Sequence, residues 1–135
     1  MIKRSHSMRL GELEKLLLNY LWKERIADAK KVHSHFEKKR GGSLNTIQST
    51  LDRLYKKDLL SREKRGHAYS YSPAVERKEL LGSLITDITH ELAKNDTNAV
   101  LEAFVDITTK LDKKSLQRLE DLIATRKADN SSKVN

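Results

Sequence analysis

The chain has 135 residues, and its 27 Lys and Arg against 19 Asp and Glu give it a formal net charge of +8. Because it contains no cysteine, disulfides, thiolate metal sites and cysteine nucleophiles are excluded, and no apolar run approaches the ~20 residues that a membrane span needs. Residues 1–72 hold 17 Lys and Arg against 8 Asp and Glu, whereas residues 73–135 hold 10 against 11. This asymmetry favours a polyanionic partner for the first half, either nucleic acid or an anionic membrane, and does not choose between them. We expect a cytoplasmic protein.

Three helices are predicted before the only proline, Pro73. The first runs from about Gly11 to Lys23, and its broad apolar face places it at the centre of a core. The second covers about residues 28–39, with Asp28 as its N-cap, and ends at Gly41-Gly42. The apolar positions recur at helical spacing: Leu13, Leu17, Tyr20 and Leu21 in the first helix, and Ala29, Val32 and Phe36 in the second.

A third helix is predicted from about Leu44 to Lys57, with Ser43 as its N-cap and an apolar side formed by Ile47, Leu51 and Leu54. Its opposite side begins with mediocre helix formers, which indicates a role other than helix stability. Direct reading of bases would supply that role, because Asn and Gln pair bidentately with adenine and Thr contacts the thymine methyl group. The candidate base-contacting residues are Asn45, Thr46, Gln48, Ser49 and Arg53.

The pattern changes from helical to alternating after Leu59. Residues 60–64 and 68–72 are predicted to form two strands around Arg65-Gly66-His67, where Gly66 supplies the positive φ of a tight turn. Tyr69 and Tyr71 are expected to face the helices as core residues. The hairpin tip is basic, and the candidate contacts to the DNA backbone are Ser43, Lys56, Lys64, Arg65 and His67.

Beyond Pro73 the sequence predicts three amphipathic helices, with Asp96 and Thr97 as caps of the second and Asp112 as cap of the third. These helices carry more leucine and isoleucine than about 55 residues bury alone, so a homodimer is expected. The predicted interface consists of Leu81, Leu84, Ile85, Ile88, Leu92, Leu101, Phe104, Leu119, Leu122 and Ile123.

These elements predict a mainly α protein with a small β-hairpin. A winged helix-turn-helix DNA-binding domain is expected in residues 1–73, an α-helical dimerisation domain in residues 74–128, and a disordered tail in residues 129–135. The third helix would enter the major groove of double-stranded DNA. Nothing indicates an enzyme, a metal or a cofactor, since no catalytic constellation is visible and His33 and His35, two apart on a helix, point away from each other.

With these elements in this order, the sequence resembles the penicillinase-repressor family of bacterial regulators, the BlaI/MecI/CopY group. The resemblance rests on Leu10-Gly11-Glu12-Leu13-Glu14 with Leu21-Trp22, on Thr46-Ile47-Gln48-Ser49-Thr50-Leu51 with Arg53-Leu54 and Lys56-Lys57, and on Gly66-His67-Ala68-Tyr69-Ser70-Tyr71-Ser72-Pro73. A looser match at Val100-Leu101-Glu102-Ala103-Phe104-Val105 extends it. It implies homodimers that bind inverted-repeat operators and block transcription, with Asn45, Thr46, Gln48, Ser49 and Arg53 at the DNA.

Two departures from the family pattern bear on regulation. Copper-responsive members carry a C-terminal cysteine cluster, which this chain lacks, so that mode of sensing is excluded. The β-lactam-responsive members are inactivated by proteolysis before a phenylalanine, typically after an asparagine. The corresponding pair here is Ala103-Phe104, and the resemblance implies a regulatory protease as a further partner.

Three other functions stay open from the sequence. A ligand-sensing winged-helix regulator would hold an effector pocket in the C-terminal helices, and a ligand-induced thermal shift without DNA would favour it. A sequence-indifferent DNA or RNA architectural protein would not discriminate an inverted repeat from a random duplex. An adaptor that binds partner proteins through its leucine-rich helices would leave no operator footprint.

Overall fold

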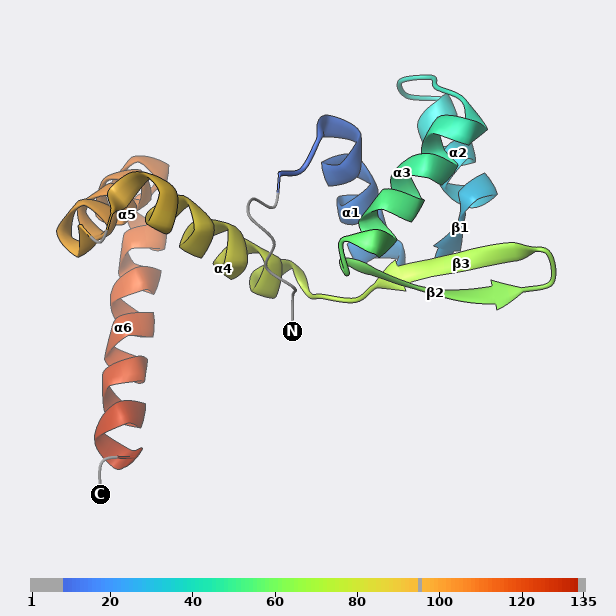
Figure 1. Ribbon diagram of the computed structural model, residues 1–135. Coiled ribbons are helices and arrows are strands. Elements are labelled where there is room, and N and C mark those ends of the chain that lie inside the picture. The colour runs from blue at the N-terminus through green and yellow to red at the C-terminus, as the bar shows by residue number, and fades with distance from the viewer. Residues whose placement is uncertain (1–8, 95, 134–135) are drawn as a thin grey trace. The chain divides into compact units, whose positions relative to one another are not determined.

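The computed structural model shown in Figure 1 describes residues 9–94 and 96–133, without the side chains of residues 132 and 133. The chain consists of two compact units, with the boundary between Asp87 and Ile88. The first unit contains α1 (Glu12–Glu24), β1 (Ala27–Asp28), α2 (Ala29–Glu37), α3 (Leu44–Lys56), β2 (Leu60–Arg65), β3 (Ala68–Pro73) and α4 (Arg77–Ile88) up to Asp87. The second contains η1 (Thr89–Ala93), α5 (Thr97–Leu111) and α6 (Lys113–Lys133).

Short polar side chains and glycines set the ends of the helices in the first unit. Asp28 Oδ1 accepts a 2.8 Å hydrogen bond from the Lys31 N–H at the start of α2. Ser43 Oγ accepts a 3.1 Å hydrogen bond from the Thr46 N–H at the start of α3. Between these helices, Gly41 and Gly42 adopt φ angles of 75° and 115°, which residues with a Cβ rarely adopt. The predicted caps and helix stop are therefore confirmed.

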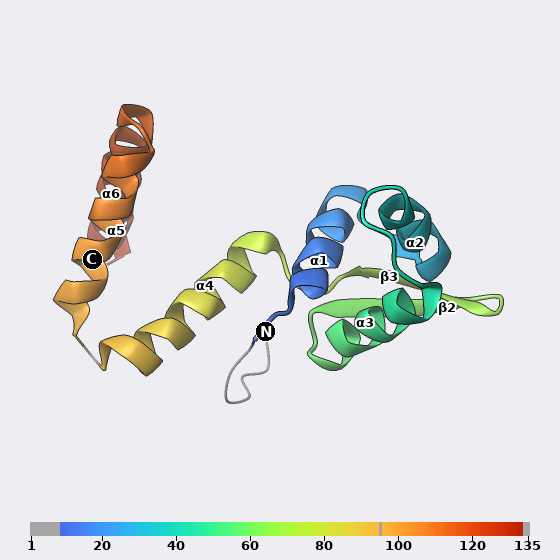
Figure 2. The ribbon, with the colours of Figure 1, turned by 90° about the horizontal axis from the view of Figure 1, so that it is seen from above.

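The predicted hairpin forms and gains a third strand. β2 and β3 pair antiparallel from Leu60↔Pro73 to Arg65↔Ala68. The two residues of β1 pair with the other edge of β3, which gives the strand order β1-β3-β2. Figures 1 and 2 show α1, α2 and α3 on one side of this sheet. The mainly α fold class is confirmed, with a three-stranded sheet in place of the hairpin alone.

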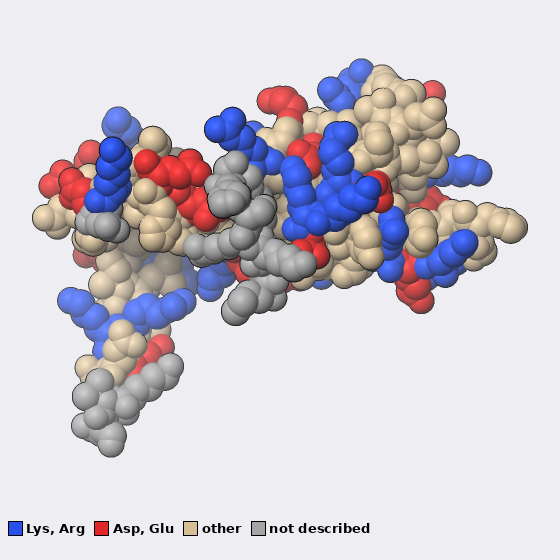
Figure 3. All heavy atoms as spheres, in the orientation of Figure 1, with Lys and Arg blue, Asp and Glu red and all other residues tan. Residues whose placement is uncertain are grey.

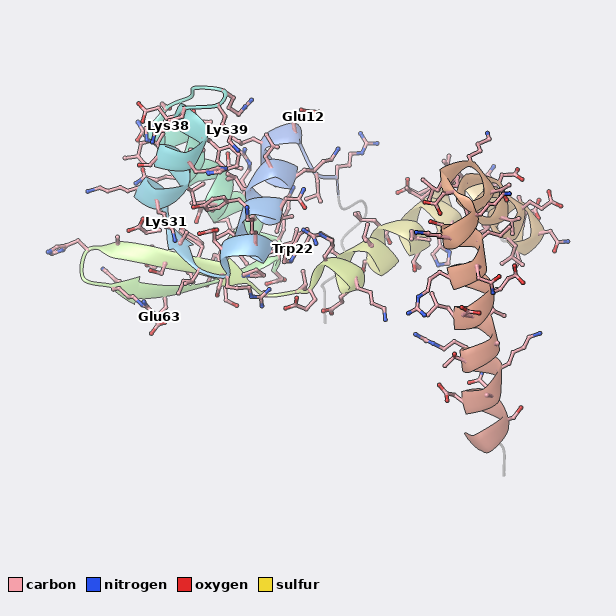
Figure 4. All side chains as sticks on the ribbon, turned by 180° about the vertical axis from the view of Figure 1, so that it is seen from behind. Glu12, Trp22, Lys31, Lys38, Lys39 and Glu63 are labelled. Carbon is pink, nitrogen blue, oxygen red and sulfur yellow. The ribbon has the colours of Figure 1, made fainter. Side chains whose placement is uncertain are left out.

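The core of the first unit extends past Pro73 into α4. Leu80 of α4 is only 2% exposed, and Leu84 packs partly against the same cluster of buried side chains. The Trp22 Nε1–H at the end of α1 donates a 2.9 Å hydrogen bond to the Val75 carbonyl, and Figure 4 labels this tryptophan. Burying a leucine contributes about 1.5–3 kcal/mol, so α4 helps to stabilise the first unit. The predicted domain ends at Pro73, whereas the compact unit runs to Asp87.

A buried ion pair ties the start of α1 to the end of α3. The Glu14 side chain is 8% exposed, and its Oε2 lies 2.7 Å from Lys57 Nζ. Glu14 Oε1 also accepts a 2.9 Å hydrogen bond from the Gly11 N–H. Burial raises the pKa of the Glu14 carboxyl, but the hydrogen bonds from Lys57 and Gly11 and the charges of Lys57 and Arg53 together lower it below its ordinary value of 4.5.

Replacing this carboxylate by an amide should make the stability less dependent on pH. Glu14→Gln is expected to lower the free energy of unfolding by about 1–3 kcal/mol at neutral pH, because Lys57 loses its buried acceptor. Since the pKa of Glu14 is lower in the folded than in the unfolded state, this contribution is fully present above 4.5 and is lost as the pH falls through the folded-state pKa. Urea unfolding of the unmodified protein and of Glu14→Gln, from neutral pH down through the folded-state pKa of Glu14, measures this pH dependence. An equal difference in the free energy of unfolding at every pH would contradict the prediction.

The second unit is helical, and its predicted caps form. Asp96 Oδ1 accepts a 3.1 Å hydrogen bond from the Ala99 N–H, and Asp112 Oδ1 accepts a 2.6 Å hydrogen bond from the Ser115 N–H. None of the side chains described in this unit is buried. No glycine or proline interrupts the chain after Asp112, and α6 continues to Lys133, whereas the sequence analysis expects a disordered tail from Asp129.

Candidate nucleic-acid interface

The outer face of α3 carries the predicted base-contacting residues, and all of them are exposed. The core side of this helix buries Ile47, Thr50, Leu51 and Leu54. Because the helix turns by about 100° per residue, the remaining positions lie away from the core. The exposed residues of the predicted site on α3 are Asn45, Thr46, Gln48, Ser49, Arg53 and Lys56.

Three hydroxyl groups on this face bind the helix itself. Ser43 Oγ accepts from the Thr46 N–H as the N-cap, and it also lies 2.9 Å from the Thr46 hydroxyl. Ser49 Oγ donates to the carbonyl oxygens of Asn45 at 2.9 Å and Thr46 at 3.2 Å. Ser43 therefore caps the start of α3, whereas the Ser49 hydroxyl is occupied by the backbone of the preceding turn, which explains part of the unusual composition of the first turns.

The amide groups of Asn45 and Gln48 differ from these hydroxyls. Within the part of the chain that the structure describes, neither amide has a hydrogen-bond partner. The two side chains are three positions apart, so they lie next to each other on one face of the helix. Each amide offers a donor and an acceptor side by side, which is the pattern that matches the major-groove edge of adenine.

The C-terminal half of α3 is cationic. Arg53 Nη2 donates a 3.2 Å hydrogen bond to the Thr50 hydroxyl and remains exposed. Lys56 Nζ lies 3.0 Å from Asp52 Oδ2, a surface pair one helical turn apart. Figure 3 shows Lys and Arg side chains gathered over α3 and the start of α1. A helix that is polar and uncharged at its start and basic at its end suits base contacts followed by phosphate contacts.

The hairpin presents a second basic group. Lys64, Arg65 and His67 are exposed at its tip, where Gly66 adopts a φ of 65°. Arg65 forms a 3.5 Å ion pair with Glu63, an exposed pair that phosphate oxygens would compete with readily. An open hollow of about 420 Å³ lies between the outer face of α3 and the hairpin. Its lining brings Gln48 together with His67.

One residue in this hollow is missed by the sequence analysis. The Arg62 guanidinium lies 3.9 Å from the ring centroid of Tyr55 and 4.1 Å from that of Tyr69, and its Nη1 lies 3.1 Å from Asp52 Oδ1. The expectation that Tyr69 is a core residue is wrong, because it is 39% exposed, whereas Tyr71 is buried. The alternation of side chains along a strand could have predicted this position of Arg62. Arg62 is two positions after the buried Leu60, so both side chains face the helices.

The predicted dimer residues are largely exposed in the single chain. Leu92 is 78% exposed, and among the others only Leu84 and Leu119 are partly buried. Ala103 and Phe104 are also exposed, in the middle of α5. The described residues contain no group of three or more side chains suited to a metal ion. None of the helices in the described part is both long and apolar enough to cross a membrane.

The comparisons with known proteins point to one family. The sequence profile described as "Penicillinase repressor" matches residues 10–125. A "Transcriptional regulator BlaI" of Mycobacterium tuberculosis (strain ATCC 25618 / H37Rv) is 31% identical over 80 residues, which are 58% of this chain and 58% of that protein. The match thus spans less than two thirds of that relative. A "Penicillinase repressor" of Staphylococcus aureus is 22% identical over 107 residues, 79% of this chain and 84% of that protein.

A solved structure agrees with the architecture of the first unit. The solution structure of the DNA binding domain of the repressor BlaI is similar to this chain with a TM-score of 0.50 and 25% sequence identity. The similarity covers 57% of this chain and 93% of that domain. The three helices and the hairpin therefore form a winged helix-turn-helix. Since the family profile extends through most of both units, the chain belongs to the penicillinase repressor family.

Proposed function

We propose that this chain is a transcriptional repressor that binds an inverted-repeat operator as a homodimer. The observation that carries the proposal is the outer face of α3, where two exposed amides, with no hydrogen-bond partner among the described residues, precede a cationic last turn. The family relationship supports the same function, because the relatives bear the names of repressors and regulators.

In this proposal α3 enters the major groove and the hairpin follows the adjacent backbone as a wing. Asn45 and Gln48 contact bases, and Thr46 and Ser49 support them at the groove edge. Arg53 is predicted among the base contacts, but it lies in the cationic last turn of α3, so we assign it to phosphates together with Lys56, Lys64 and Arg65. Ser43 and His67 lie at the margins of the interface. The negative potential of DNA then meets the basic half of the chain.

The proposed dimer forms through the exposed apolar side chains beyond Pro73. Leu81, Ile85, Ile88 and Leu92 would form one part of the interface. Leu101, Phe104, Leu122 and Ile123 would form another, and the partly buried Leu84 and Leu119 are further members of the proposed interface. The support is the number of large apolar side chains that these helices leave exposed, since extensive exposed apolar surface marks interaction sites. A two-fold symmetric dimer matches the symmetry of an inverted repeat.

A protease that cuts between Ala103 and Phe104 would inactivate the proposed repressor. The bond lies in the middle of α5, which spans Thr97–Leu111, and both side chains are exposed. Proteases in general bind their substrates as extended segments, so this bond becomes cleavable only when α5 unwinds locally. Cleavage would remove the rest of α5 and all of α6, and with them much of the proposed interface.

Removing one of the free amides should weaken binding to the operator alone. Gln48→Ala is expected to cost about 1–3 kcal/mol on the operator, because a bidentate contact to a base is lost. On a random duplex it should cost little, since phosphate contacts are unchanged. Fluorescence anisotropy with both duplexes measures the two losses.

The matched control is Gln117→Ala, the same change on α6, where the amide binds Asp121 at 3.1 Å. This variant should bind the operator as the unmodified protein does. Equal losses on operator and random DNA for Gln48→Ala would show that this face of α3 does not read bases.

A further inference from the structure

Arg62 occupies an unusual position for a cation beside a DNA-facing helix. The aromatic rings of Tyr55 and Tyr69 lie close to its guanidinium, at centroid distances of 3.9 and 4.1 Å. Its Nη1 donates a hydrogen bond to Asp52 Oδ1 at 3.1 Å, and its side chain is 24% exposed. Because Tyr55 and Asp52 belong to α3 and Tyr69 to β3, this one side chain joins the helix to both strands of the hairpin.

This contact lies where the hairpin loses other support. β1 pairs with β3 only at Ser70 and Tyr71, so the strands continue towards Arg65 and Ala68 as a two-stranded ribbon. Figure 2 also shows the hairpin tip extending beyond the helices. Arg62 makes the contact to α3 that lies nearest to the hairpin tip. Among the described residues, no ion pair, hydrogen bond or ring contact joins α3 to the hairpin closer to that tip. An isolated two-stranded ribbon has little stability of its own.

We propose that Arg62 is a positioning residue that fixes the wing relative to α3 and compensates the charge of Asp52, and that it does not bind DNA phosphate. The proposal rests on the DNA-binding function proposed above. In this proposal Lys64 and Arg65 make the phosphate contacts of the wing. Arg62 sets the distance between these two residues and α3. Together with the pair to Lys56, the contact of Arg62 also explains how Asp52 is tolerated on the outer face of α3.

Arginine is required for this role, and lysine would not replace it. The planar guanidinium stacks on aromatic rings while its edge binds a carboxylate, whereas the lysine ammonium is a compact point charge. A phosphate contact does not require arginine, because either cation neutralises a phosphate. Arg62→Lys therefore separates the two roles while it keeps the net charge.

The first experiment needs no DNA. Backbone order parameters from ¹⁵N relaxation should fall from about 0.85 to below about 0.6 for Lys64–His67 in Arg62→Lys, while those of α1 and α3 stay unchanged. Arg65→Ala, which leaves the stack intact, should keep the order of Lys64 and His67. Unchanged order in Arg62→Lys would overturn the positioning role, and this result is independent of whether an operator is found.

The second experiment measures operator affinity in a double-mutant cycle. Arg62→Lys should weaken binding by about 5- to 30-fold in the unmodified background, and by clearly less in the Asp52→Asn background, where the edge of the guanidinium has no carboxylate to bind. An affinity within about twofold of the unmodified protein, or equal losses in both backgrounds, would overturn the proposal. Failure of the unmodified protein to prefer an operator over random DNA would instead contradict the proposed function.

Discussion

Removing residues 88–135 is expected to weaken binding to an inverted-repeat operator by about 10²- to 10⁴-fold, although every proposed base contact is retained. The first unit has its own core, which includes Leu80, so a fragment of residues 1–87 should fold. A shorter fragment that ends at Val75 would lose Leu80 and expose the core beneath it. As a monomer, the fragment loses the effective concentration that holds a second reading helix at the second half-site.

A fragment of residues 1–103 imitates cleavage before Phe104 and should show the same loss. Sedimentation velocity and gel-shift titration on both fragments and the whole chain measure assembly and affinity together. A chain that lacks only residues 129–135 is the control, since it keeps Leu119, Leu122 and Ile123 and should remain a dimer. If the 1–87 or the 1–103 fragment stays dimeric and binds as tightly as the whole chain, the interface lies elsewhere and cleavage has no basis as a switch.

The affinity for the operator should also fall by about 10⁴-fold when the salt concentration rises fourfold, from about 50 to about 200 mM. Each subunit exposes four cations on α3 and the hairpin: Arg53, Lys56, Lys64 and Arg65. A dimer would thus neutralise about eight phosphates, and each contributes about −0.9 to the slope of log affinity against log salt. The expected slope is therefore about −7.

Arg65→Ala removes one such contact from each wing and should flatten the slope by about two, with similar losses on all sequences. Lys23→Ala is the matched control, because this exposed cation lines a hollow between α1 and α2 and belongs to neither α3 nor the hairpin. It should leave the slope unchanged. A slope near about −2 for the unmodified protein would mean that α3 and the hairpin lie away from the backbone.

Local chemistry made much of this fold predictable from the sequence. Asp28, Ser43 and Asp96 each accept the hydrogen bond expected of an N-cap, and Gly66 adopts the expected positive φ. These features depend on residues only a few positions apart. The strand β1 was not predictable in this way, because two residues are too few to show alternation and their pairing with β3 joins positions distant in the sequence.

The errors have a common physical origin, since periodicity shows which side of an element is apolar but not what covers it. The predicted first domain ends at Pro73, yet Leu80 of α4 completes the core of the first unit, while its neighbour Leu81 is 51% exposed. Tyr69 and Tyr71 share one side of β3, but the helices cover only Tyr71, and Tyr69 instead lies against Arg62. The exposed face of α3 was predictable because its core side is unambiguous, whereas homodimerisation, the operator and the cleavage site stay predictions.

The hydrogen bonds at the start of α3 distinguish residues that stabilise or cap the helix from residues that are proposed to contact bases. Ser43 and Ser49 are engaged with the backbone of the helix, so changes at these positions alter its folding as well as its surface. The side-chain amides of Asn45 and Gln48 have no hydrogen bond to the helix backbone among the described residues. Under the proposed function, substitutions at these two positions would change which operator is bound without a compensating change elsewhere in the first unit.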